Sequence, residues 1–279
     1  MRIINPQDIV TAVAEMCISA NRNIPADVIA ALETGKQAEE SPIARSILDE
    51  ILENDRLAAS EGLPACQDTG AALVFLDLGQ DAHVNGNIND AVNEGVRQGY
   101  EKGYLRKSIV TDPLERVNSG DNTPAFIYLR SVPGDKLTIT VAPKGFGSEN
   151  MSRLAMLKPS DGEAGVRQFI YDTVRQAGPN ACPPMVVGIG IGGTSDKAAE
   201  ISKRALLRSL DSHHPIERYA RMERELKEKI NSTGIGPQGF GGRTTVLAVL
   251  IETMPTHIAG LPCAVTINCH SARHERRVL

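Results

Sequence analysis

Five cysteines are distributed over the 279-residue chain, and three of them stand beside residues that can take part in chemistry. Cys66 is followed by Gln67 and Asp68, Cys182 by two prolines, and Cys269 by a histidine. Each of the three lies at a predicted loop or strand end, where a thiolate can reach a metal or a substrate. Three such thiolates could hold an iron–sulfur cluster, although spacing alone leaves the ligand set open.

The other two cysteines have the sequence context of buried side chains. Cys17 lies on the apolar face of a predicted helix, and Cys263 lies within a predicted strand. A free cysteine in such a position packs as a small hydrophobic residue. An odd number of widely spaced cysteines also differs from the disulfide framework of a small secreted protein.

Two further patterns indicate a different class of protein, a non-catalytic dinucleotide-binding or zinc-binding module. Residues 188–193, GIGIGG, satisfy G-x-G-x-x-G after a predicted strand, and Asp211 follows 18 (211 − 193) residues later. Asp211 does not clearly end a second strand, and no complete βαβ unit is evident. A glycine-lined strand end whose following helix binds another anion is therefore favoured.

The histidines and cysteines of 257–274 could bind zinc, but five residues separate Cys263 from Cys269, more than in a usual zinc finger.

The composition of the chain argues against nucleic-acid and membrane partners. The chain is 41% hydrophobic with a net charge of −4, and its 4% aromatic content includes no tryptophan, so it offers neither a basic surface nor stacking platforms for nucleic acid. No signal-peptide pattern opens the sequence, and no window approaches the roughly 20 apolar residues of a membrane span. We expect a cytoplasmic protein without a nucleic-acid or membrane partner.

Apolar periodicity and turn residues predict the elements that must position these side chains. Helices are expected over 6–61, 88–103, 162–177, the segment after Thr194, and 215–230. Strands are expected at 71–79, in an antiparallel hairpin over 125–142, before the glycine-rich turn, and in TTVLAVLIE and PCAVTIN. The mixture predicts a mixed α/β (α+β) fold, in which an N-terminal helical layer packs on sheet elements. Residues 1–279 would form one domain or two closely packed subdomains.

Six segments carry a resemblance to a known family. In chain order they are PACQDTG (64–70), DNTPA (121–125), KGFGSENMS (144–152), ACPPMVVGIGIGGTSDKA (181–198), GIGPQGFGG (234–242) and NCHSARH (268–274). The series resembles class I iron–sulfur fumarate hydratases and their relative L-tartrate dehydratase, over nearly the whole chain. The resemblance implies a fold like the N-terminal domain of class I fumarases and a 4Fe–4S cluster on Cys66, Cys182 and Cys269, with one iron lacking a protein ligand.

This resemblance also implies an activity and a substrate site. The enzyme would be a hydro-lyase of the tricarboxylic acid cycle that reversibly hydrates fumarate to (S)-malate, with the open iron as a Lewis acid. Gln67, Asp68, Arg106 and Gly147 match the substrate-binding positions, and Asp68 would accept substrate hydrogen bonds or orient a base. Within the KGFGSENMS segment, Phe146 stands at a position where the family usually has a glycine. L-tartrate dehydratase and mesaconate hydratase are the alternative activities.

A partner subunit is implied as well. The chain ends 10 (279 − 269) residues after Cys269, whereas single-chain members continue into a second domain with further substrate-binding groups. The resemblance therefore implies an α subunit that pairs with a separate β subunit, in an α2β2 heterotetramer acting on a small dicarboxylate.

Overall fold

The computed structural model describes residues 1–279, which have the predicted mixed α/β fold and divide into two compact units. Unit 1 comprises Met1–Ile24, Asp55–Phe146 and Arg273–Leu279, and unit 2 comprises Pro25–Asn54 and Gly147–Ala272. None of the helices combines the length and the hydrophobicity that crossing a bilayer would require.

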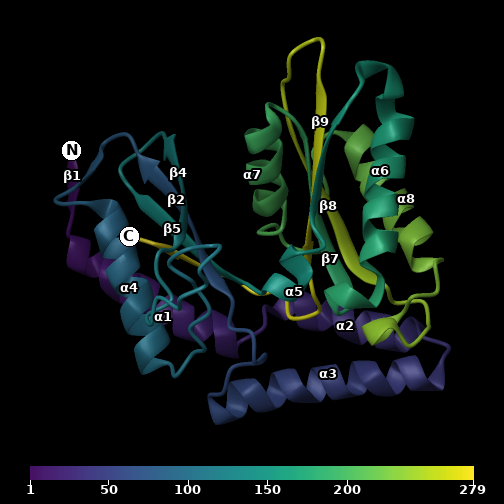
Figure 1. The fold of residues 1–279 in the computed structure, drawn as a ribbon, viewed down its shortest axis with the longest axis horizontal. Helices are drawn as coiled ribbons and strands as arrows, with labels where there is room; N and C mark the ends of the chain where they lie inside the picture. Colours follow the sequence, from purple (N-terminus) through teal and green to yellow (C-terminus); the bar gives the residue numbers. More distant parts are fainter. The chain divides into compact units, whose positions relative to one another are not determined.

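Unit 1 is built on a four-stranded sheet in the order β10-β5-β2-β4. Its strands are β2 (Ala71–Gly79), β4 (Phe126–Val132), β5 (Leu137–Lys144) and β10 (Glu275–Val278), and a small parallel pair is formed by β1 (Arg2–Ile4) and β3 (Ala82–Val84). Helices α1 (Pro6–Arg22) and α4 (Ile88–Lys102) cover one face of the sheet (Figure 1). The core lies between them, because Val74, Leu76 and Ile139 pack against Val13 and Val96.

The predicted hairpin over 125–142 is wrong. Strands β4 and β5 do not pair, because β2 lies between them, parallel to β4 and antiparallel to β5. Residues 71–76 of β2 are all buried, so the central position removes the most apolar strand from water on both edges. The turn after β4 is held by the end of β2, where the Gly79 N–H donates to Lys136 O over 2.8 Å and the Gln80 N–H to Val132 O over 2.8 Å.

Two glycines that weaken the sequence prediction of α4 have a packing role. A Cβ on Gly95 would lie 2.7 Å from the Val13 side chain, and one on Gly99 would lie 2.7 Å from Ala14 O. The glycines therefore permit the close approach of α1 and α4, which offsets their low helix propensity.

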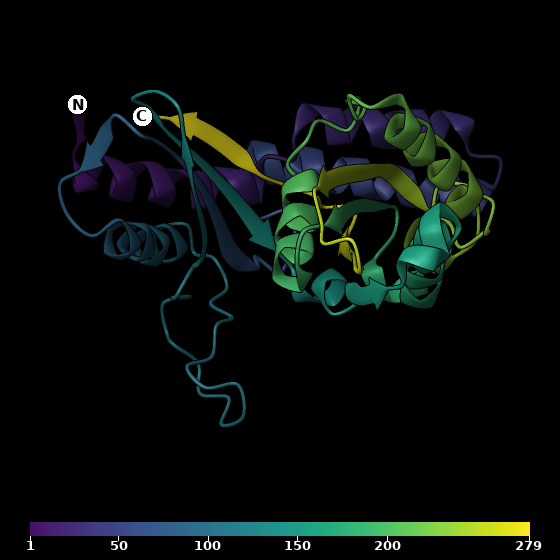
Figure 2. The same ribbon diagram turned by 90° about the horizontal axis from the view of Figure 1, so that it is seen from above.

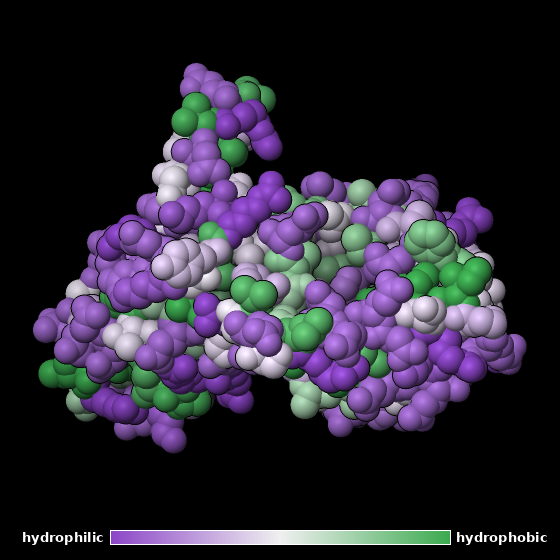
Figure 3. Space-filling model, turned by 90° about the horizontal axis from the view of Figure 1, so that it is seen from below, coloured by the Kyte–Doolittle hydropathy of each residue, from purple (hydrophilic) through white to green (hydrophobic).

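Residues 103–125, between α4 and β4, extend away from the helices of unit 1 (Figure 2). A bridge between Val110 and Asn118 closes this projecting segment. Hydrophobic side chains are scattered among its hydrophilic ones (Figure 3), and Tyr104 and Leu114 are 91% and 89% exposed. Arg106 stands at the base of the segment.

Unit 2 contains a second four-stranded sheet in the order β6-β9-β7-β8. Its strands are β6 (Arg153–Leu157), β7 (Met185–Gly192), β8 (Val246–Met254) and β9 (Leu261–Asn268), and its helices include α2 (Ala26–Ala38), α6 (Gly162–Ala177), α7 (Ser195–Ala205) and α8 (Glu217–Asn231). Helix α7 packs on one face of the sheet and α6 and α8 on the other (Figure 1). Helices α3 (Pro42–Glu61) and α5 (Phe146–Glu149) each run across a boundary between the units.

The glycine-rich segment 188–193 serves the packing of α7 on β7. A Cβ on Gly188 would come within 2.2 Å of Ser202 O, and one on Gly190 within 2.1 Å of Ala198 O. Strand β8 is parallel to β7, so a crossover unit exists that the sequence prediction missed. Asp211 lies between α7 and α8 and not at a strand end, so the dinucleotide pattern lacks its acidic partner.

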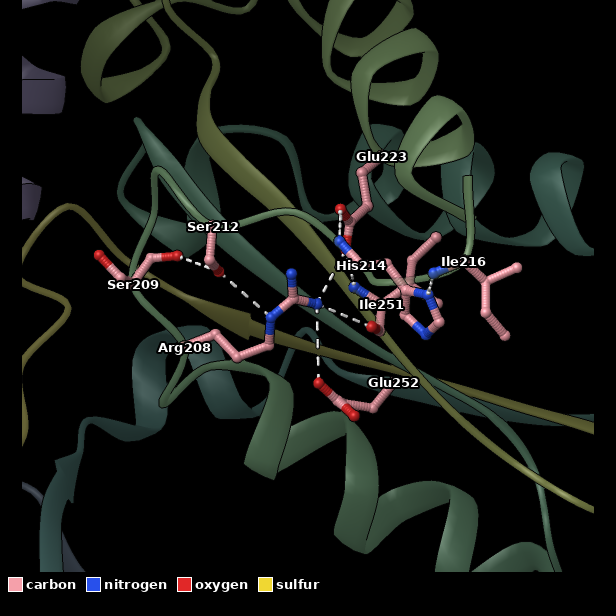
Figure 4. A network of polar contacts seen from close by, with 8 residues as sticks. All are labelled: Arg208, Ser209, Ser212, His214, Ile216, Glu223, Ile251 and Glu252. Atoms are coloured by element: carbon pink, nitrogen blue, oxygen red, sulfur yellow. Dashed lines mark hydrogen bonds and ion pairs between the residues drawn. The ribbon is translucent and has the colours of Figure 1, made fainter. Parts of the chain in front are cut away.

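A polar network fastens α8 to β8 (Figure 4). Glu223 is only 3% exposed, and its Oε1 accepts from Arg208 Nη1 over 2.9 Å and from the Ile251 N–H over 2.8 Å. Its Oε2 accepts from the His214 N–H over 3.1 Å. A buried carboxylate needs such partners, so Glu223 fixes the loop after α7 against the sheet.

Candidate active site

The PACQDTG segment forms a tight turn that enters β2. The Asp68 N–H donates to Cys66 Sγ over 3.4 Å, and the Asp68 Oδ1 atom accepts from the Gly70 N–H over 3.0 Å. Cys66 and Asp68 are half-buried and Gln67 is exposed. The turn therefore leaves a thiol, an amide and a carboxylate accessible within three consecutive residues.

Antiparallel pairing brings this turn to the loop that carries KGFG. Ala71 at the start of β2 pairs with Lys144 at the end of β5. Beyond that pair, the Asp68 Oδ2 atom accepts from the Phe146 N–H over 2.9 Å. Both oxygens of the carboxylate are thus held by backbone donors, which fixes its orientation. Gly147 follows Phe146 directly in the chain and is exposed.

Arg106 is tied to the same turn through its backbone. Thr69 Oγ1 donates to Arg106 O over 2.8 Å, and the Arg106 side chain is exposed. The geometry of unit 1 therefore brings together Cys66, Gln67, Asp68 and Arg106. A planar guanidinium in this position has the fork geometry that binds a carboxylate.

Two buried side chains that sequence reasoning did not single out support the turn from behind. Tyr100, at 0% exposure, places its hydroxyl 2.8 Å from Thr69 O and 2.9 Å from Gly70 O. Burial raises the pKa of Tyr100, so the hydroxyl stays protonated and can donate. Asn122 Nδ2 donates to Gly70 O over 3.1 Å. Asn122 belongs to the DNTPA segment, one of the six segments that carry the family resemblance, and that motif is the signal by which the sequence could have indicated this residue.

Arg273 is the third such residue. It is 4% exposed, and its Nη2 donates to Asp68 O over 2.6 Å while its Nε donates to Asn21 Oδ1 over 3.2 Å. Arg273 belongs to the NCHSARH segment, in which the sequence predicts a role for Cys269 and none for the arginine. Because Arg273 binds a backbone carbonyl, its effect on the turn is positional.

In unit 2, two of the three candidate ligands lie side by side. Strands β7 and β9 are antiparallel with Val186 opposite Asn268, so the residue before β7 and the residue after β9 meet at one end of the sheet. The His270 N–H donates to Cys182 O over 3.1 Å, which joins the Cys182 turn to the Cys269 turn. Cys182 is exposed and Cys269 is half-buried.

Cys182 has a left-handed backbone conformation, with φ 51° and ψ 65°. For a residue with a Cβ this conformation costs roughly 1–2 kcal/mol, so its surroundings must enforce it. The Cys182 N–H donates to Pro179 O over 3.0 Å, in addition to the bond from His270. Both backbone groups of Cys182 are therefore fixed, while its side chain is open to solvent.

A family model described as fumarate hydratase (Fumerase) matches residues 10–278. The chain belongs to the Fumerase family. At 42% identity over 268 residues, covering 94% of each chain, it is similar to a Methanocaldococcus jannaschii protein provisionally named L(+)-tartrate dehydratase subunit alpha. It is also similar to the L(+)-tartrate dehydratase subunit alpha of Escherichia coli, at 33% identity, and of Shigella sonnei, at 32%, each covering 94% of this chain and 87% of the relative. This Fumerase-family chain is thus a hydro-lyase.

The cysteines of this Fumerase-family chain fall into two classes. Cys17 and Cys263 are both 0% exposed. Burial raises the pKa of each thiol to about 12, and the negative charge of Glu275 contributes at Cys17. Because the thiolate is the form that binds metal, these two residues are poor ligands. Cys66, Cys182 and Cys269 have the accessibility that a ligand requires.

The donor set fits the iron–sulfur cluster expected of this Fumerase-family chain. Thiolate is the usual ligand of such clusters, and three accessible thiols would leave one iron of a 4Fe–4S cluster without a protein ligand. Cys66 belongs to unit 1, and Cys182 and Cys269 belong to unit 2. No three histidine, cysteine, aspartate or glutamate side chains gather in the structure as a metal-binding group.

Proposed function

We propose that this chain is the α subunit of a 4Fe–4S hydro-lyase that adds water reversibly to fumarate to give (S)-malate. Membership of the Fumerase family supports the reaction class. The observation that best supports a cluster is that two of the five cysteines are buried and three are accessible. The three accessible cysteines are those of the three loop motifs. Cys66, Cys182 and Cys269 would hold the cluster.

Water addition to fumarate forms one C–O and one C–H bond, and negative charge accumulates on the carbon next to a carboxylate. When bound, the cluster supplies an open Lewis-acid iron for an oxygen of the substrate or of water. The residues of this chain must bind the dicarboxylate, hold it in one orientation and move protons at defined atoms.

The turn after Cys66 has groups for these tasks. The two Asp68 oxygens each accept one backbone N–H and retain further acceptor capacity, so the carboxylate can accept a hydrogen bond from a hydroxyl or take its proton. The exposed amide of Gln67 can donate to a carboxylate oxygen. Arg106 can bind the remote carboxylate in a bidentate manner, and the open backbone at Gly147 can approach it closely.

A second subunit would complete the site. The relatives at 42%, 33% and 32% identity carry names that specify a subunit alpha, which supports a separate β subunit for this chain too. We infer an α2β2 heterotetramer that functions in the tricarboxylic acid cycle. Substrate-binding groups from the β subunit would supplement Arg106.

L(+)-tartrate is the second candidate substrate, and the names of the relatives favour it. Tartrate, like malate, is a four-carbon dicarboxylate that loses a hydroxyl and a proton from adjacent carbons. One extra hydroxyl distinguishes the two, and a site that hydrogen-bonds this group would reject the substrate that lacks it by a large factor.

A direct competition of substrates tests the proposal. The chain is co-expressed anaerobically with a β subunit from the same organism, reconstituted with iron and sulfide, and assayed with fumarate and with L(+)-tartrate. Higher kcat/KM for fumarate, dependent on both subunits, is the expected result. Higher kcat/KM for tartrate would replace the substrate but keep the reaction class, and turnover of neither would contradict the proposal.

A further inference from the structure

Glu39, between α2 and α3, is a buried carboxylate that the proposed reaction does not use. Its side chain is 1% exposed. Oε2 accepts from the Arg243 N–H over 2.8 Å, the Thr244 N–H over 3.1 Å and Thr244 Oγ1 over 3.3 Å. Oε1 accepts from the Glu40 N–H over 3.0 Å and from the Ser41 N–H over 3.3 Å. This many donors on one buried carboxylate identify an anchoring point.

The anchored segment is the end of the glycine-rich loop 234–242. A Cβ on Gly242 would lie 2.8 Å from Glu39 Oε2, and the φ of Gly242 is +119°, so glycine is required where the loop reaches the carboxylate. The other end of the loop is held by the Gly236 N–H, which donates to Thr245 Oγ1 over 3.1 Å. Glu39 and Thr245 thus fix the loop at both ends.

The middle of this loop holds the residue that follows Cys182. The Gln238 N–H and the Gln238 Nε2 both donate to Pro183 O, over 2.8 and 2.9 Å. A Cβ on Gly239 would come within 2.4 Å of Pro179 Cβ, so the loop also lies against the residue that caps the Cys182 turn. Contacts within unit 2 therefore run from Glu39 through the loop to both sides of Cys182.

We propose that Glu39 is a positioning residue for Cys182, holding loop 234–242 against Pro179 and Pro183 so that the thiol keeps one orientation toward the cluster. The inference rests on the proposed function, because it assigns a purpose to the Cys182 geometry. Cys182 has an uncommon left-handed conformation outside any helix or strand, so it depends on neighbouring segments for its shape. The loop donates two hydrogen bonds to Pro183 O, the carbonyl of the residue that follows Cys182.

Removal of the Glu39 charge should loosen this arrangement. In Glu39→Gln an amide group replaces one oxygen and places N–H donors opposite backbone N–H donors. Glu39→Asp keeps the negative charge but shortens the side chain, so it should hold the loop better than Glu39→Gln and less well than the wild-type residue. Gln238→Ala keeps the backbone bond to Pro183 and removes the side-chain bond, which tests the same contact from the loop side.

Glu223→Gln is the matched control. Glu223 is also a buried carboxylate of unit 2, but it contacts Arg208, His214 and Ile251 (Figure 4), none of which belongs to loop 234–242 or directly adjoins it, as Arg243 does. If loss of a buried carboxylate acts only by weakening the unit, the two Glu→Gln changes should behave alike.

The experiment measures cluster retention in the full chain. Wild-type and variant chains are reconstituted anaerobically with iron and sulfide, and cluster loss to an iron chelator is followed by visible absorbance and by electron paramagnetic resonance. We expect loss at least ten-fold faster in Glu39→Gln, an intermediate rate in Glu39→Asp, several-fold faster loss in Gln238→Ala, and a wild-type rate in Glu223→Gln.

Two results would overturn the inference while leaving the proposed function intact. One is a wild-type rate in both Glu39→Gln and Gln238→Ala. The other is equally fast loss in Glu223→Gln, which would assign the effect to general weakening of unit 2. A wild-type chain that binds no cluster at all would overturn the proposed function and this inference together.

Discussion

The Phe146 N–H donates a 2.9 Å hydrogen bond to the Asp68 carboxylate, across 78 positions of the chain. This bond joins the turn after Cys66 to the loop after β5, and the Gly70 N–H holds the other carboxylate oxygen over 3.0 Å. The Asp68 carboxylate therefore has a fixed orientation. Its backbone is fixed as well, because Arg273 donates to Asp68 O.

Asp68→Asn should impair turnover without loss of the cluster. The amide removes the acceptor that takes a proton and turns a donor toward the backbone N–H of either Gly70 or Phe146. We expect kcat to fall about 10²–10⁴-fold, the range of general acid–base contributions. Steady-state kinetics of the reconstituted two-subunit enzyme, with iron content measured in parallel, gives the answer.

Asp77→Asn is the control for Asp68→Asn, since Asp77 lies on β2, the strand that follows the Asp68 turn, and pairs with Arg130 over 2.8 Å. It should leave kcat within about two-fold of wild type, as surface ion pairs contribute little. Equal loss of activity in the two variants would remove Asp68 from the site.

Arg106→Ala should weaken dicarboxylate binding. The exposed guanidinium loses a bidentate, charge-assisted contact, so we expect KM to rise about 10- to 100-fold with a smaller change in kcat. The cluster absorbance should not change. Arg116→Ala, an exposed arginine of the same projecting segment, should match wild type, and an unaltered KM in Arg106→Ala would return Arg106 to the solvated surface.

Alkylation of the cluster-free chain should separate the cysteines. Cys66, Cys182 and Cys269 are accessible, whereas the thiols of Cys17 and Cys263 are buried with a pKa of about 12. A thiol with that pKa is ionised in roughly one molecule in ten thousand at pH 8. Iodoacetamide labelling at pH 8, read by peptide mass spectrometry, should modify the first three residues and spare the other two. Rapid labelling of Cys263 would show that β9 opens readily.

The stabilisation by Glu39 should depend on pH. Burial raises the pKa of the Glu39 carboxyl. Hydrogen bonds from the backbone N–H groups of Arg243, Ser41, Thr244 and Glu40 together lower this pKa by more than burial raises it, so the folded pKa lies below the ordinary 4.5. Stability from the ionised form is thus present above pH 4.5 and is lost as pH falls through the folded pKa.

We therefore expect Glu39→Gln to lower the free energy of unfolding by about 2 kcal/mol at pH 7, in the range for hydrogen bonds to charged groups. Urea denaturation at pH 7 and at successively lower pH should show the gap between wild type and variant shrinking below pH 4.5. A gap that stays constant across this range would mean that the carboxylate charge is not what stabilises the loop.

Local sequence patterns predict most elements of this fold. Strand β2 and helix α6 begin and end at the predicted residues, and α1 begins at Pro6, the first residue of the predicted helical segment. Such features depend on neighbours within one turn or strand. The pairing of β2 between β4 and β5 depends on contacts between distant segments, and the short turn at 133–135 favours a hairpin that does not form.

The residues of the candidate site likewise include some that local sequence predicts and others that depend on contacts between distant segments. Cys66, Gln67, Asp68 and the other motif residues are recognisable because their types are unusual at loop positions. Glu39 lies in the segment AEES, which resembles any solvated helix end, yet its side chain is 1% exposed. Its importance comes from residues 243 and 244, more than 200 positions away, so no local pattern predicts it.

Spectroscopy of cysteine variants tests whether Cys66, Cys182 and Cys269 hold the cluster. Wild-type chain and the five Cys→Ala variants are reconstituted anaerobically with iron and sulfide, then compared by visible absorbance, electron paramagnetic resonance and iron per chain. We expect loss of the 4Fe–4S signature in Cys66→Ala, Cys182→Ala and Cys269→Ala, and its retention in Cys17→Ala and Cys263→Ala. Retention in any of the first three, or loss in Cys263→Ala with retention in Cys269→Ala, would contradict the ligand set.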